Sequence, residues 1–147
     1  MINQRPKILL LSGGSMETDR LHGILAKYAA VELAENVPEM LRLLAGSSYS
    51  VVLCDRFFAT GTWKDALSAV QTRYPALPTV VVSQTREFEE GSQEWVEVLA
   101  AGAFDLLLVP SSESAVISLL AHAIVSGEAR TSKTREWKLM EKPIAGM

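Results

Sequence analysis

The chain has 147 residues, 48% of them hydrophobic, which is enough for one domain with one buried core. Its formal net charge of −3 speaks against a nucleic-acid-binding face, and no apolar run approaches the roughly 20 residues of a membrane-spanning helix. Cys54 is the only cysteine, so an internal disulfide and a multi-cysteine metal site are excluded. No secretory signal pattern stands at the start of the sequence, and we expect a soluble, cytoplasmic protein with no membrane partner.

The first half of the chain alternates short apolar runs with helical patterns. Residues 8–11 are continuously apolar and precede Ser-Gly-Gly, which predicts a buried strand. A helical face follows over residues 21–28, then a short second strand over 30–33. Asn36 is expected to cap a helix whose core face spans residues 37–44. Residues 51–54 predict a third buried strand that ends at Asp55.

The second half repeats this alternation. A helical period spans residues 63–70, a β-branched fourth strand spans 79–82, and a helix is expected over 91–101. Residues 104–109 predict a fifth strand, and residues 116–124 carry the last helical face. The apolar period fades after about Gly127. Residues 1–127 are therefore expected to form the domain, and residues 128–147 a helix extension and a loose C-terminal tail.

Five apolar strands, each followed by a helix, indicate an α/β fold with a parallel sheet covered on both faces. Right-handed crossovers favour a doubly wound, flavodoxin-like sheet of order 2-1-3-4-5 with five helices. In such folds the functional site lies beyond the carboxyl ends of the strands. The candidate segments are therefore residues 12–15, 55–62, 83–85 and 109–112.

The loop over residues 12–15 offers one function of its own. Backbone N–H groups at such a helix start can bind a flavin phosphate or another anion, although the loop lacks the spaced glycines and the lysine of a nucleotide fingerprint. A flavodoxin-like domain that binds a small ligand or anion stays open as an alternative. His22 and His122 each stand alone on a helix, and no serine, histidine and acid arrangement is present, so we expect no enzyme.

The order of these features resembles that of bacterial response-regulator receiver domains of the CheY-like kind. The resemblance covers residues 7 to about 126. It depends on the β/α pattern, on Asp55 and Ser83 at the ends of the third and fourth strands, on residues 102–105 before the fifth strand, and on Pro110 after it. It implies two-component (phosphorelay) signal transduction, with Asp55 at the phosphoacceptor position and Ser83 at the phosphate-contact position.

The chain departs from this family at the other pocket positions. The acidic pair that holds Mg²⁺ is replaced by Ser12 and Gly13, the lysine by Val109, and the aromatic switch residue by Leu106. Mg²⁺ binding is therefore disfavoured, no other cofactor is expected, and phosphorylation should be weak or absent. The sequence indicates an atypical, degenerate pseudo-receiver. An ordinary phosphorylated response regulator with an altered metal site stays open as an alternative.

The expected partners are proteins. The resemblance implies a histidine kinase or another signalling protein, and it places the partner or homodimer surface on the fourth helix, fifth strand and last helix. Arg56 could pair with Asp55 in place of the missing lysine, although neighbours at a strand end more often point apart. Trp95 is expected to be partly exposed, and the basic stretch over residues 130–138 is interpreted as a solvated helix end or tail.

Overall fold

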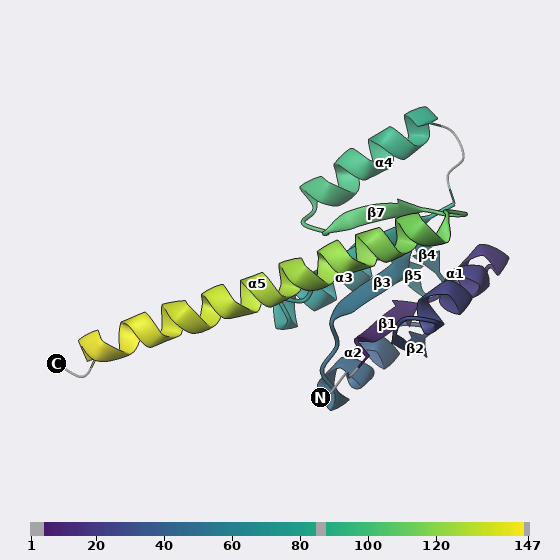
Figure 1. The fold of residues 1–147 in the computed structure, drawn as a ribbon. Helices are drawn as coiled ribbons and strands as arrows, with labels where there is room; N and C mark the ends of the chain where they lie inside the picture. The colour runs from purple at the N-terminus through teal and green to yellow at the C-terminus, as the bar shows by residue number, and fades with distance from the viewer. Residues whose placement is uncertain (1–4, 85–87, 146–147) are drawn as a thin grey trace.

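The computed structural model describes residues 5–84 and 88–145, with side chains for residues 5–84 and 92–130. A five-stranded parallel sheet of order β2-β1-β3-β6-β7 forms its centre (Figure 1). The strands are β1 (Lys7–Leu11), β2 (Ala30–Ala34), β3 (Val51–Asp55), β6 (Thr79–Ser83) and β7 (Asp105–Leu108). Counted over the sheet alone, this is the expected order 2-1-3-4-5, and the α/β class is confirmed.

The labels skip two numbers because a separate two-stranded ribbon follows Asp55. It consists of β4 (Phe57–Phe58) and β5 (Gly61–Thr62), which pair antiparallel. Strands of two residues are too short to show an alternating hydrophobic pattern, so the sequence did not predict them. The ribbon leads directly into α3, whose first residue Trp63 is buried.

Five helices cover the two faces of the sheet, as expected. They are α1 (Met16–Ala26), α2 (Val37–Gly46), α3 (Trp63–Arg73), α4 (Phe88–Ala100) and α5 (Glu113–Ala145). Alternate residues of β1 point to opposite faces. Leu9 and Leu11 pack with residues of α2 and α3, and Ile8 and Leu10 pack with residues of α1 and α5. The strands are thus buried on both sides, which explains their continuous apolar runs.

The last helix is longer than its apolar period. α5 ends at Ala145, and Figure 1 shows its C-terminal part projecting away from the sheet. Gly127 is the last residue of α5 described as buried, and a Cβ there would lie 2.8 Å from Cδ of Pro78. The division into a domain over residues 1–127 and an extension beyond it stays a prediction. The side chains of residues 131–138 lie outside the described ones. Over the part of the chain described here, no helix combines the length and the apolar character needed to cross a membrane.

Candidate functional site

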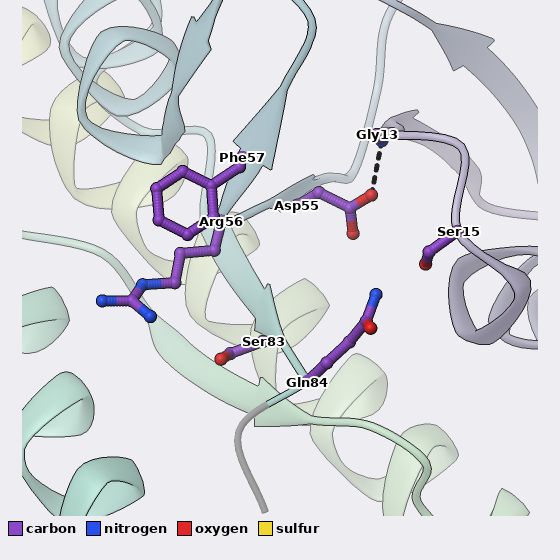
Figure 2. A pocket seen from close by; sticks show the side chains of 7 residues that line it. All are labelled: Gly13, Ser15, Asp55, Arg56, Phe57, Ser83 and Gln84. Atoms are coloured by element: carbon purple, nitrogen blue, oxygen red, sulfur yellow. Dashed lines mark hydrogen bonds between the residues drawn. The ribbon is translucent and has the colours of Figure 1, made fainter.

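A cavity lies where the strands end, between the loops that follow β1, β3 and β6. Its volume is about 350 Å³. Three of the four candidate segments contribute to its wall, as Figure 2 shows; Thr85 lies outside the described residues. The lining residues are Gly13, Ser15, Asp55, Arg56, Phe57, Ser83 and Gln84. The carboxyl ends of the strands, where the site was expected, therefore border a cavity.

Asp55, the last residue of β3, is buried with only 6% of its surface exposed. Its carboxylate accepts hydrogen bonds from two neighbours in the same chain. The Gly13 N–H donates to Oδ2 at 2.5 Å, drawn as the dashed line in Figure 2. The Thr18 hydroxyl lies 2.9 Å from Oδ1 and 3.0 Å from Oδ2. Both carboxylate oxygens are thus engaged by groups of this protein.

Thr18 is a site residue that the sequence reasoning missed. It lies in the first turn of α1 and is 1% exposed. Ser15 caps the helix: its Oγ accepts from the Thr18 N–H at 3.1 Å and lies 2.8 Å from the Thr18 hydroxyl. Because Thr18 donates its hydroxyl proton to Asp55, Ser15 must donate to Thr18. The Ser-x-x-Thr spacing indicates the cap, but nothing local indicates a partner 37 residues away.

Two glycines shape the loop after β1 for different reasons. A Cβ on Gly13 would lie 2.5 Å from the carbonyl oxygen of Phe57 and 3.1 Å from Oδ2 of Asp55. Gly14 has a φ of +85°, which side-chain-bearing residues rarely adopt. Its N–H donates to Oγ of Ser12 at 2.9 Å. The loop therefore places a bare backbone against Asp55 and leaves no room for a side chain at residue 13.

Burial and hydrogen bonding act on Asp55 in opposite directions. Burial raises the pKa of the Asp55 carboxyl, the Gly13 N–H and the Thr18 hydroxyl lower it, and the net pKa is above the ordinary value. Burial, assisted by the charge of Asp55, raises the pKa of the adjacent Cys54 thiol to about 12. Cys54 is therefore a neutral core residue, as its place in a buried strand predicted.

The opposite wall of the cavity is organised around a carboxylate from α4. Ser83, 2% exposed, donates its hydroxyl to Oε1 of Glu94 at 2.6 Å. Nε of Arg56 lies 3.4 Å from the same oxygen. The Arg56 guanidinium also lies over the ring of Phe57, 5.0 Å from its centroid. Figure 2 shows the Arg56 side chain directed away from the Asp55 carboxylate, so Arg56 serves Glu94 and does not replace the lysine beside Asp55.

The other positions named from the sequence have structural partners. Ser12 holds the turn through the Gly14 N–H. Val109, just after β7, is 4% exposed and packs in the core on the α5 side of the sheet, while its N–H donates to the carbonyl of Ser83 at 2.8 Å. Leu106 is 9% exposed and packs in the core on the side of α2 and α3. Val109 and Leu106 are thus both packing residues of the core.

These residues offer a poor ligand set for Mg²⁺. Magnesium is bound through one or two carboxylates together with phosphate oxygens and waters. Asp55 offers one carboxylate, which already accepts an N–H and a hydroxyl, and Gly13 offers no side chain. Among the described side chains, those of residues 5–84 and 92–130, no group of three or more His, Cys, Asp or Glu comes together as a metal site would require.

No family model and no curated protein matches the sequence. Solved structures do match the fold. The signal receiver domain of an HD domain-containing protein from Pseudomonas fluorescens Pf-5 is 16% identical, with a TM-score of 0.74, over 90% of this chain and 96% of that one. A CheY-like response regulator receiver domain protein from Methanospirillum hungatei JF-1 is 18% identical, with a TM-score of 0.70, over 86% and 99%.

A third similar structure bears a different functional name. A structure of adenylate cyclase from Rhodopirellula baltica is 19% identical, with a TM-score of 0.75, over 91% of this chain and 98% of that chain. At these identities the similarity shows the fold alone. The chain has the fold of response-regulator receiver domains, and its activity has to be argued from its own residues.

Proposed function

We propose that the chain is an atypical receiver domain of two-component signal transduction that acts through protein contacts, with weak or absent phosphorylation of Asp55. The observation that carries this proposal is the hydrogen bonding of the Asp55 carboxylate. Both oxygens of its carboxylate accept hydrogen bonds from Gly13 and Thr18. The residue therefore works as a fixed acceptor that ties the loop after β1 and the start of α1 to the end of β3.

The chemistry of phosphoryl transfer supports a reduced reactivity. Transfer to a carboxylate brings two anions together, and positive charge must offset the repulsion between them. Here Val109 is a buried apolar residue and Arg56 pairs with Glu94. Losing one such electrostatic contribution costs about 3 kcal/mol, on the order of a hundredfold in rate. An attacking carboxylate would also have to give up the Thr18 hydroxyl.

The proposed partners are a histidine kinase or another signalling protein, or a second copy bound through the last helix, in the cytoplasm. Exposed apolar side chains on α4, β7 and α5 support a protein-binding face. They are Trp95 at 49%, Val96 at 61%, Leu108 at 38% and Val125 at 64% exposed. The partial exposure of Trp95 confirms the expectation from the sequence. We propose no enzymatic activity and no nucleic-acid partner.

The anion-binding alternative finds little support in the loop after β1. Three N–H groups of this loop and the first turn of α1 already have partners within the chain: Gly13 donates to Asp55, Gly14 to Ser12, and Thr18 to Ser15. A phosphate would have to displace these acceptors and would meet the Asp55 carboxylate. Absorbance of the purified protein in the flavin region tests this alternative directly, and we expect none.

Intact-mass measurement after incubation with acetyl phosphate and Mg²⁺ tests the proposal. We expect no gain of a phosphate, because the charges that assist transfer are missing. A receiver domain with a complete acidic pair and lysine serves as the positive control. Mg²⁺-dependent labelling of the wild-type protein that disappears in Asp55→Asn would instead establish an ordinary phosphorylated regulator with an altered metal site.

A further inference from the structure

Glu94 is a buried carboxylate in the part of α4 whose side chains are described, and few other side chains are buried there. Among the side chains of α4 that are described, those of residues 92–100, Glu94 at 7% and Val98 at 2% exposed are the buried ones. Trp95 at 49% and Val96 at 61% exposed lie between them. Figure 1 shows α4 at the edge of the sheet beside β7. Residues 92–100 of α4 thus bury little apolar surface, so polar contacts of this part of the helix matter for its attachment.

Glu94 supplies that attachment through hydrogen bonding and charge. Its Oε1 accepts the Ser83 hydroxyl at 2.6 Å and lies 3.4 Å from Nε of Arg56. Hydrogen bonds to an ionised group are about twice as strong as neutral ones, and a buried carboxylate without partners would be strongly unfavourable. Ser83 ends β6 and Arg56 directly follows β3. One side chain of α4 thus connects the helix to two neighbouring strands.

Ser83 and Arg56 both line the cavity beside Asp55. They are a hydroxyl and a cation of the kind that an anion bound in the cavity would attract. Both instead contact a carboxylate that belongs to the protein itself. The anion that binds the Ser83 hydroxyl and the Arg56 guanidinium is the Glu94 carboxylate on α4, so these contacts form without phosphorylation of Asp55.

We propose that Glu94 is an internal anionic anchor that fixes α4 against the ends of β3 and β6 independently of phosphorylation. The exposed surface of Trp95 and Val96 is then presented in one constant orientation. The indole of Trp95 adds a second link, since its N–H donates to Oδ1 of Asp105 at 3.1 Å. The inference that this orientation serves a partner depends on the proposed function, whereas the anchoring itself does not.

Hydrogen–deuterium exchange of the full chain, without a phosphate donor, tests the anchor. Glu94→Gln keeps the volume of the side chain and removes its charge. We therefore expect the weakened attachment of α4 to make the amides of residues 92–100 exchange about tenfold faster. The amides of β3 and β6 should be unaffected. The indole signal of Trp95 in ¹H–¹⁵N spectra, assigned with Trp95→Phe, should shift. Glu97→Gln is the matched control, since Glu97 lies on the same helix and pairs on the surface with Lys64 at 3.0 Å.

Exchange in Glu94→Gln equal to that in Glu97→Gln would overturn the proposal. If Glu94→Gln also exposes the amides of β3 and β6, Arg56→Met decides, because Arg56 lies partly in solvent and its loss leaves the core intact. Faster exchange confined to residues 92–100 then supports the anchor, and unchanged exchange there refutes it. The mass assay reports only on Asp55, so failure of the proposed function and failure of the anchor are separate results.

Discussion

The two walls of the cavity hold their carboxylates by different means. On the β1 side, Asp55 accepts from the Gly13 N–H and from the hydroxyl of Thr18, a residue that is 1% exposed, and neither donor carries a charge. On the β6 side, Glu94 meets a buried hydroxyl and a guanidinium whose side chain is 39% exposed. The first arrangement depends on shape, because the backbone must approach closely. The second depends on charge and reaches into solvent, where ions screen it.

The difference suggests separate tasks for the walls. A carboxylate held by uncharged, rigidly placed donors makes a structural tie between α1 and β3. A carboxylate held partly by a solvent-accessible cation makes a tie that ionic strength or a charged partner can weaken. The β1 side should therefore respond most to changes of shape, and the β6 side to changes of charge. The predictions below examine the β1 side of this comparison.

The largest expected effect follows from adding one methyl group at Gly13. Gly13→Ala should lower the free energy of unfolding by about 1–3 kcal/mol, because its Cβ would lie 2.5 Å from the Phe57 carbonyl oxygen. Gly13→Asp should cost more, since its carboxylate would also meet Asp55. Urea denaturation at neutral pH measures both.

Gly23→Ala is the matched control for this change. Nothing lies within 4 Å of a Cβ at Gly23, which is inside α1. Replacing a helical glycine by alanine should stabilise the protein by roughly 0.5–1 kcal/mol. If Gly13→Ala were as harmless as Gly23→Ala, the close contact of the loop with Phe57 would not constrain the β1 side.

The next effect in size concerns the hydroxyl of Thr18. Thr18→Val keeps the shape of the side chain, removes the hydroxyl that contacts Asp55 and leaves the bond from the Gly13 N–H in place. We expect a loss of about 1–3 kcal/mol in the free energy of unfolding. Thr72→Val is the control: its hydroxyl donates to the Ser68 carbonyl at 2.8 Å on an exposed helix surface. Equal losses in the two variants would show that the bond to Asp55 adds nothing.

The sequence predicted the parts of the molecule that depend on local patterns. All five strands of the sheet follow from short apolar runs, and Asp55 and Ser83 lie at strand ends as expected. The cap at Asn36 is also confirmed, since its side chain accepts from the Glu39 N–H at 2.8 Å. Each of these features is set by residues within a few positions of one another.

The partners of the candidate site could not be predicted in this way. The bond from Thr18 to Asp55 joins residues far apart in the chain, and the bond from Ser83 to Glu94 depends on how α4 packs beside β7. Both bonds depend on tertiary packing, which leaves no periodic pattern in the sequence. The direction of Arg56 was equally open, because a pattern of residue types does not show which of two carboxylates a long side chain reaches.

The smallest expected effect is the pH dependence that Asp55 contributes. Burial raises the pKa of Asp55, while the Gly13 N–H and the Thr18 hydroxyl lower it, so the opposing contributions partly cancel. With the net pKa above its unfolded value of about 3.9, the native state binds more protons between the two values. In that window the stability due to Asp55 is greatest at low pH. It declines as pH rises through the native pKa, and it becomes constant above it.

Asp55→Asn should remove this dependence while keeping a side chain that can accept from Gly13. We expect the difference in unfolding free energy, wild type minus Asp55→Asn, to fall with rising pH above about pH 4 and then to level off. Urea denaturation at several pH values measures this difference, and ¹³C titration of the Asp55 carboxyl gives its pKa. Thr18→Val should raise that pKa further, because it removes a hydrogen bond that favours the charged form. A difference that grows with pH would mean that the two hydrogen-bond donors lower the pKa of Asp55 by more than burial raises it. The β1 side would then be stabilised mainly by the charge of its carboxylate, as the β6 side is.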